Sequence, residues 1–213
     1  MADSSSVNVL IAFYSRNGST EALAKAIAEG VTSEGGTPVL RRAREIVSRD
    51  VMAKAPGWVE NADRMNAAYA EPTEADAESA DALIFGTPTR FGNVSSELKA
   101  WVDSLGGLWF QGKLNGKAGS VFCSTSTRHG GNESTNLTMY NFMAHLGLII
   151  VPLGYADPNM FKGAGTPYGA SSVSGQNNSP PSEDELEVAR YQGRRVTQVA
   201  RALKATGETT TKG

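Results

Sequence analysis

Hydroxyl side chains, a small amide and a glycine gather in the segment Ser15–Thr20, between an apolar run and a helical pattern. Such groups, together with the free N–H groups of a helix start, suit a phosphate. The segment lacks both the G-x-G-x-x-G spacing of dinucleotide sites and the Gly-Lys-Ser/Thr of ATP-binding loops. It therefore predicts a single phosphate held by hydroxyls and backbone, with an ordinary capped turn as the alternative. The candidate contacts are Ser15, Arg16, Asn17, Gly18, Ser19 and Thr20.

A second polar segment reads Gly86-Thr87-Pro88-Thr89-Arg90-Phe91-Gly92-Asn93. Proline fixes the backbone here, and we expect the two glycines to let it pass close to a ligand. Backbone groups in this segment can hydrogen-bond the polar edge of a flat heterocycle. Phe91 offers an apolar face, and Arg90 can offset negative charge on a reduced ring or a substrate. The alternative is a strand-to-helix turn with a solvated arginine.

The third segment, Ser124-Thr125-Ser126-Thr127-Arg128-His129-Gly130-Gly131, is rich in hydrogen-bond donors and flexible backbone. Like the other two, it directly follows an apolar run. We expect it to supply the remaining edge and wall of the same pocket.

Apolar runs at 7–13, 38–43, 80–85, 117–123 and 148–153 predict five strands, most of them buried on both faces. Helical patterns separate them: one stops near Gly35-Gly36, one is capped by Asn93 and ends at Gly106-Gly107, and one spans about 134–145. A Ser-x-x-Glu capping box at Ser182–Glu185 opens the last helix. This alternation predicts a doubly wound five-stranded parallel sheet with helices on both faces and ligand loops at the strands' carboxyl ends.

Two stretches interrupt this pattern. Residues 43–73 are irregular, with a weak helical patch at 62–70, and we interpret them as an excursion that serves assembly. The segment 155–179 is rich in Gly, Pro and Ser, and it is long enough to indicate a functional loop. We predict one domain over 1–206 and a polar tail at 207–213. The arginines at 41, 42 and 44 indicate a solvated face or an intersubunit contact.

Composition excludes several classes of protein. A formal net charge of −2 leaves no basic footprint for nucleic acid. No apolar run approaches the roughly 20 residues that span a bilayer. The single cysteine, Cys123, excludes an intrachain disulfide and is expected to be a buried small residue, which fits a reducing, cytoplasmic setting. Two histidines and one cysteine, far apart, show no metal-site spacing.

Taken together, these segments resemble a known family. The stretch from Tyr14 to Thr20 looks like the FMN phosphate loop of flavodoxin-like proteins, and Gly86–Asn93 is similar to the hallmark segment of the WrbA-type NAD(P)H:quinone oxidoreductases. The resemblance covers nearly the whole chain, with departures at Asn17, Ser19 and Arg128-His129. The other similar segments are Gly106-Gly107-Leu108-Trp109, Ala144-His145-x-Gly147, Gly165-Thr166-Pro167-Tyr168-Gly169-Ala170 and Ala189-Arg190-Tyr191-Gln192-Gly193.

The resemblance implies a flavodoxin-like fold, bound FMN and an NADH or NADPH electron donor. It implies that His145 lies near the flavin ring, and that Trp109 lines the substrate side. We also expect Phe91 to frame the substrate space and Tyr168 to order the long loop near the flavin rim on that side, with loop packing as the alternative for Tyr168. The resemblance also implies a homodimer or homotetramer in which Trp109 reaches a neighbouring subunit. From the residues alone, His145 can equally be a helix C-cap, and Trp109 a packing residue. The FMN contacts that we expect outside Ser15–Thr20 are Pro88, Thr89, Arg90, Phe91, Gly92, Ser124, Thr125, Ser126, Thr127 and His145.

The function that the resemblance implies is two-electron reduction of a quinone by NAD(P)H through FMN, with ping-pong alternation of both substrates at one flavin face. His145 would hydrogen-bond a quinone oxygen or donate a proton to it, and Arg90 would favour an anionic reduced flavin or hydroquinone. Two alternatives stay open. One is a flavodoxin-like one-electron carrier, and the other is a flavin-binding scaffold that acts through protein partners.

Overall fold

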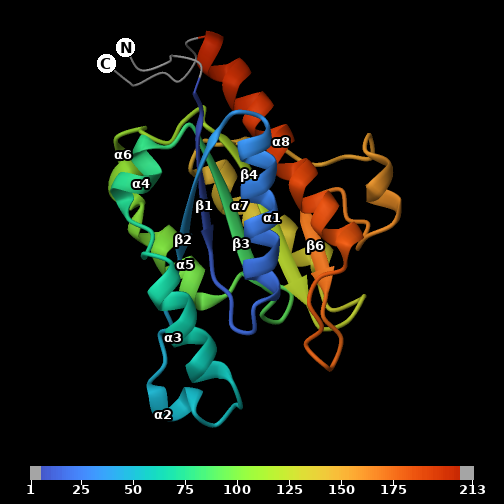
Figure 1. The fold of residues 1–213 in the computed structure, drawn as a ribbon. Helices are drawn as coiled ribbons and strands as arrows, with labels where there is room; N and C mark the ends of the chain where they lie inside the picture. Colours follow the sequence, from blue (N-terminus) through green and yellow to red (C-terminus); the bar gives the residue numbers. More distant parts are fainter. Residues whose placement is uncertain (1–5, 207–213) are drawn as a thin grey trace.

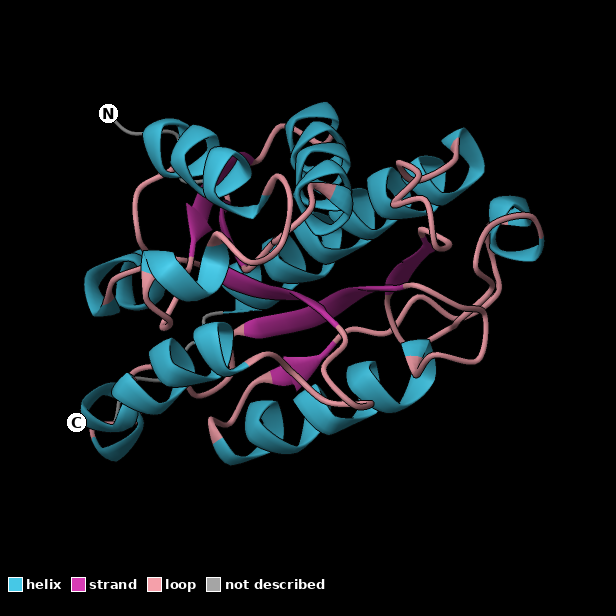
Figure 2. Cartoon of the chain, turned by 90° about the horizontal axis from the view of Figure 1, so that it is seen from below, coloured by secondary structure: helices cyan, strands magenta, loops and turns pink. Residues whose placement is uncertain are grey.

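The apolar runs form a parallel sheet in the computed structural model, which describes residues 6–206. Its strand order is β2-β1-β3-β4-β5, and every pairing within it is parallel. Helices cover both faces of the sheet (Figures 1 and 2). The predicted flavodoxin-like doubly wound fold is confirmed. The strands are β1 (Asn8–Phe13), β2 (Thr37–Arg42), β3 (Ala82–Pro88), β4 (Ala118–Thr125), β5 (Ile149–Ile150) and β6 (Ala170–Val173).

Two strands share the fifth position of this sheet. β5 pairs with Ala118 and Gly119 at the start of β4, and β6 pairs with Phe122–Thr125 at its end. The chain leaves the sheet edge between them and returns to it, so the expected strand at 148–153 forms only in its first half. β6 lies inside the loop that we predicted at 155–179, because its sequence Ala-Ser-Ser-Val has no apolar run.

Alternate residues of the central strands face opposite layers of helices. Val9, Ile11 and Phe13 of β1 pack toward α1 and α8, whereas Leu10 and Ala12 pack toward α5 and α7. Burial on both faces explains the nearly continuous apolar run. The longer helices are α1 (Ser19–Ser33), α3 (Trp58–Ala68), α5 (Ser96–Ser104), α7 (Asn132–His145) and α8 (Glu183–Thr206). The shorter ones are α2 (Arg49–Met52), α4 (Glu74–Ser79), α6 (Gly106–Phe110) and the 3₁₀ turn η1 (Pro158–Phe161).

Helix ends test the capping predictions. The Ser182–Glu185 capping box is confirmed: the Ser182 N–H donates to Glu185 Oε2 at 2.8 Å, and the Glu185 N–H donates to Ser182 Oγ at 3.3 Å. The Asn93 cap was wrong, because Ser95 occupies the N-cap of α5. Asn93 instead closes a tight turn with Arg90 through two backbone hydrogen bonds. The helix that we expected to end at Gly106-Gly107, α5, ends at Ser104, and Gly106 begins the short helix α6.

The excursion at 43–73 contains α2 and α3, and Figure 1 places both beyond the carboxyl ends of the strands. They enclose a small apolar cluster of Met52, Trp58 and Ala62. The prediction of a solvated arginine face was wrong for Arg42, whose side chain is completely buried. Its guanidinium is paired with Glu45, which lies in the excursion.

Three remaining predictions concern burial and the chain ends. Cys123 is buried, and burial raises the pKa of its thiol to about 12, which leaves it unreactive at neutral pH. No helix within residues 6–206 is long and apolar enough to cross a membrane. The predicted tail at 207–213 lies outside the described residues, and one domain over 1–206 stays a prediction.

Candidate active site

A cavity of about 210 Å³ lies where the loops after β1, β3 and β4 meet. All three predicted segments contribute to its wall, as expected of loops at the carboxyl ends of neighbouring parallel strands. Eleven of the predicted contacts line it, and two further residues, Ser174 and Asn178, complete it. The lining residues are Ser15, Arg16, Asn17, Ser19, Thr20, Pro88, Thr89, Arg90, Ser124, Thr125, Ser126, Ser174 and Asn178.

The first loop presents unpaired donors to this cavity. Gly18 adopts the left-handed conformation with φ of 99°, and its N–H donates to Ser15 Oγ at 3.1 Å. No side chain caps α1, and within residues 6–206 the N–H groups of Ser19, Thr20 and Glu21 have no hydrogen-bond partner. A helix start left open in this way is suited to an anion. Thr20 also meets Ser124 hydroxyl to hydroxyl at 2.9 Å, which joins the first and third loops.

A buried carboxylate stands beside this anion site. Glu21 belongs to the first turn of α1, and its side chain is 5% exposed. Arg64 of α3 donates to both of its oxygens, at 3.0 and 2.6 Å, and Lys25 and Tyr69 each lie 3.0 Å away. These partners neutralise the carboxylate, so that it does not repel an anion in the cavity.

This pairing predicts acid sensitivity. Burial alone would raise the pKa of Glu21, but bonds from Arg64, Lys25 and Tyr69 outweigh it and lower the pKa from 4.5 to about 2. The ionised Glu21 therefore contributes its full stabilisation of the folded state above pH 4.5, and this contribution is lost as the pH falls towards 2. Because Arg64 and Lys25 are half exposed, we expect a loss of about 1–2 kcal/mol. Urea unfolding between pH 5 and 2.5 measures it, and Glu21→Gln should flatten this part of the profile. An unchanged slope in that variant would refute the assignment.

The second loop brings Pro88, Thr89 and Arg90 to the cavity. Phe91 follows with φ of 54°, an uncommon conformation for a residue with a side chain, and its ring is completely exposed. The expectation that Gly86 passes close to a ligand was wrong. Gly86 lies within β3, where an added Cβ would sit 1.9 Å from Phe122 Cζ, so this glycine makes room for the core.

The third loop contributes its first three residues only. Thr127 lies outside the cavity, and its carbonyl accepts a hydrogen bond from Thr125 Oγ1 at 2.8 Å. Arg128 and His129 line a separate groove with Phe161 and Lys162. β4 extends to Thr125, so the end of this strand and Ser126 line the cavity, and the chain has left the cavity by Thr127.

Neither Ser174 nor Asn178 was predicted as a contact residue, although both line the cavity. Asn178 Oδ1 accepts a hydrogen bond from Asn17 Nδ2 at 3.1 Å, and Ser174 Oγ donates to the Thr125 carbonyl at 3.3 Å. Both follow β6 within residues 155–179, where the length of the segment predicts a functional loop. Length alone does not distinguish these two residues from the many other small polar residues of the segment.

Three predicted residues lie away from the cavity of their own chain. His145 ends α7, whose first turn follows the third loop, and 14 residues of helix span about 21 Å. Trp109 lies on α6, at the end of the molecule opposite α2 and α3 (Figure 1). Tyr168 precedes β6 and accepts a hydrogen bond at its carbonyl from Tyr140 of α7. His145 and Trp109 are both exposed.

The cavity fits the phosphate end of FMN. Its wall carries hydroxyls, amides, open N–H groups and the side chains of Arg16 and Arg90, and no carboxylate of residues 6–206 lines it. The doubly wound sheet and this donor-lined edge define a flavodoxin-like nucleotide-binding protein.

The chain belongs to the NADPH-dependent FMN reductase family, whose model matches residues 6–160. It is 46% identical to a Geobacter sulfurreducens protein named NAD(P)H dehydrogenase (quinone), over 92% of this chain and 99% of that protein. A protein of the same name from Geobacter metallireducens is 45% identical, over 93% and 100%. The crystal structure of a flavodoxin, a WrbA-like protein from Agrobacterium tumefaciens, superposes with a TM-score of 0.64 at 26% identity, covering 92% of this chain and 98% of that one. The predicted family and the predicted class, a flavin-dependent oxidoreductase, are confirmed.

Proposed function

We propose that this protein is an FMN-dependent NAD(P)H:quinone oxidoreductase. The observation that carries the proposal is the donor-lined cavity at the open start of α1, flanked by Arg16 and Arg90. The name of the curated relatives supports the two substrates. FMN, when bound, supplies the redox chemistry, accepting a hydride and passing on an electron pair.

The residues Ser15–Thr20 would hold the phosphate of FMN, with Ser124 supporting Thr20 from the third loop. A cavity of about 210 Å³ is smaller than the roughly 300–1,000 Å³ of pockets that enclose a whole ligand. The flavin ring would therefore lie at the open side, along Pro88–Arg90 and the third loop. Arg90 would stabilise negative charge that develops on the flavin ring, and the exposed ring of Phe91 would cover an apolar face of the flavin.

His145 lies at the end of α7 that is far from the third loop, and Trp109 lies on α6, so a part for either of them at a flavin would need a second subunit. We propose that the protein forms a homodimer or homotetramer in which Trp109 closes the substrate side of a neighbour's site. His145 would then stand close enough to hydrogen-bond a quinone oxygen. Nicotinamide and quinone would occupy the same face in turn, which gives ping-pong kinetics.

The first experiment is to add FMN to the purified protein and to measure benzoquinone reduction at several concentrations of NADH and of NADPH. Parallel double-reciprocal plots support alternation at one site, and intersecting plots overturn it. Turnover that is absent with every donor and quinone favours the carrier or the scaffold. Failure to take up FMN overturns the whole proposal.

Phe91 allows a sharper test of the ring position. Because its ring is fully exposed and its φ is positive, Phe91→Gly should change the free energy of unfolding by less than about 1 kcal/mol. Loss of an aromatic contact should weaken FMN binding about 10-fold. Flavin fluorescence titration and urea unfolding measure the two effects. The control is Phe161→Ala, an exposed ring that lines the other groove, which should leave FMN affinity unchanged. Unchanged affinity in Phe91→Gly would place the ring elsewhere.

A further inference from the structure

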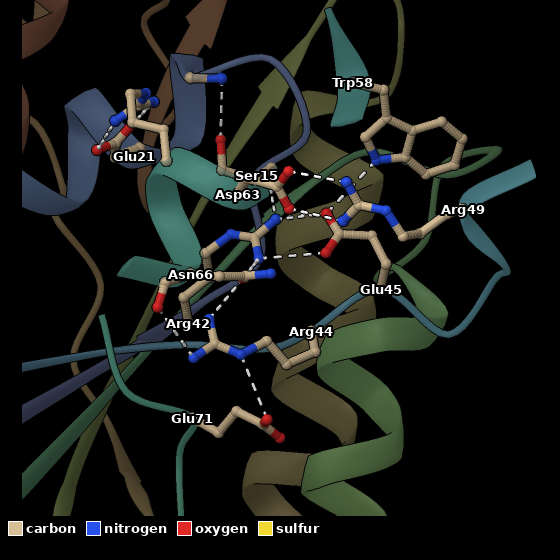
Figure 3. Close-up of polar contacts among 12 residues, drawn as sticks. Ser15, Glu21, Arg42, Arg44, Glu45, Arg49, Trp58, Asp63, Asn66 and Glu71 are labelled. Atoms are coloured by element: carbon tan, nitrogen blue, oxygen red, sulfur yellow. Dashed lines mark hydrogen bonds and ion pairs between the residues drawn. The ribbon is translucent and has the colours of Figure 1, made fainter. Parts of the chain in front are cut away.

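The side chain of Arg42, at the end of β2, is a fully buried cation directly beneath the first loop (Figure 3). Its Nη2 donates to the Ser15 carbonyl at 3.0 Å and to Glu45 Oε1 at 2.5 Å. Its Nη1 donates to Asn66 Oδ1 at 2.5 Å. A buried charge is tolerated only when it is paired and hydrogen-bonded in this way. The guanidinium thus connects the backbone of the first loop to residues of the excursion.

The excursion also reaches the second residue of the loop. The Arg16 guanidinium lies 3.7 Å from the centroid of the Trp58 ring, and Trp58 Nε1 donates to Glu45 Oε1 at 3.4 Å. Arg16 itself lines the cavity. Glu45 therefore contacts both Arg42 and Trp58, so that one carboxylate links the two side chains that hold Ser15 and Arg16. We call Arg42, Glu45, Trp58 and Asn66 the Arg42 cluster.

We propose that the excursion at 43–73 is a clamp on the phosphate loop, which acts through the Arg42 cluster and sets how tightly and for how long the FMN phosphate is retained. The inference rests on the proposed function, because it takes FMN as the ligand. Arg42 and Trp58 are positioning residues: neither lines the cavity, and each holds a residue that does.

The local geometry explains how the clamp works. Ser15 receives a hydrogen bond at its carbonyl from Arg42 and another at its hydroxyl from the Gly18 N–H. Fixing Ser15 therefore fixes the left-handed turn that leads to the open N–H groups of α1. Stacking on Trp58 similarly holds Arg16 at the wall, which lowers the entropy lost when an anion binds.

A purely stabilising role is a weaker explanation of the cluster. Replacing a buried ion pair by apolar side chains of similar size is often neutral for stability, whereas removing one partner alone is costly. The double variant Arg42→Met/Glu45→Met therefore separates the two roles. It removes both charges together and leaves no unpaired ion, and it also removes the hydrogen bond to Ser15.

The experiment compares FMN with riboflavin, which lacks the phosphate, in fluorescence titrations and dissociation-rate measurements on the full chain. We expect the double variant to bind FMN at least about 10-fold more weakly, because the hydrogen bond from the charged Arg42 guanidinium that positions Ser15 is lost. It should bind riboflavin within about 2-fold of the wild type. Trp58→Leu should increase the FMN dissociation rate. The matched control is Arg49→Gln/Asp63→Asn, which breaks an exposed ion pair of the same excursion that does not touch the loop and should change neither affinity.

The outcomes are distinct. An equal loss of FMN and riboflavin affinity, or no loss of either, overturns the clamp. A wild type that does not bind FMN overturns the proposed function instead. If apoprotein unfolding shows that the double variant does not fold, Arg42→Lys decides, because lysine keeps the charge but cannot reproduce the fork between Ser15 and Asn66. Unchanged FMN affinity in that variant also overturns the clamp.

Discussion

Gly193→Ala should destabilise the fold by about 3 kcal/mol, at the upper end of what overpacking of a protein interior costs. An alanine Cβ at this position of α8 would lie 2.1 Å from the Ile27 carbonyl oxygen and 2.8 Å from the Val31 nitrogen, both on α1. Backbone atoms cannot rotate away as a side chain can, so the two helices must move apart. Urea unfolding of the apoprotein at fixed protein concentration measures the loss.

The close contact between α1 and α8 can also be tested by a substitution on α1. A Cβ on Gly30 of α1 would lie 2.0 Å from the Arg190 carbonyl oxygen of α8, so Gly30→Ala should cost a similar amount. Because both changes force the same separation, the double variant should lose less than the sum of the two. Gly106→Ala on α6 is the control, since nothing lies within 4 Å of its added Cβ. A loss below about 1 kcal/mol in Gly193→Ala would show that the crossing is not close-packed.

Separation of these helices should also reach the site. α1 begins at the open N–H groups of the cavity, and α8 holds the sheet through Gln192, which accepts from the Ala170 N–H and donates to the Val121 carbonyl. The glycine variants should therefore weaken FMN binding together with stability. Phe91→Gly, by contrast, should weaken FMN binding alone.

The fold was predictable where burial on both faces leaves an unbroken apolar run, as in β1 and β3. The three loops were predictable for the same reason, since each follows such a run. β6 was not, because its small residues pair with β4 only after a long detour that returns the chain to the sheet edge. Ser174 and Asn178 follow that detour and were missed with it.

Arg42 shows a different limit. Arginine is rarely fully buried, so its type and its neighbours at 41 and 44 favoured a solvated face. Its burial depends on Glu45 and Asn66, which the excursion brings over it. Nothing in the irregular sequence of residues 43–73 indicates that arrangement. His145 shows a third limit: the resemblance implies that it lies near a flavin, but does not say which subunit holds that flavin, whereas for Trp109 it implies a neighbouring subunit.

The second large effect concerns that assembly. If Trp109 serves a neighbour's site, two variants that are each nearly inactive should restore activity when mixed. Thr20→Asp should abolish FMN binding by placing a carboxylate in the phosphate cavity. Trp109→Ala should keep FMN and lose most quinone turnover. The exposed position of Trp109 and Phe110, 54% and 82% exposed on α6, leaves an apolar surface available to a second copy.

Random mixing fixes the expected recovery. A working site needs an intact Thr20 in its own subunit and an intact Trp109 in the contributing neighbour. Each condition holds for half of the subunits in an equal mixture, so activity should return to roughly a quarter of the wild-type value, whatever the size of the closed assembly. Subunits are dissociated, mixed and reassembled, and hybrid formation is verified by mass spectrometry with one variant isotope-labelled. Replacing the Thr20→Asp subunit by Thr20→Asp/Trp109→Ala should abolish the recovery. If hybrids form without recovery, Trp109 does not serve a neighbour, and its exposure requires another explanation.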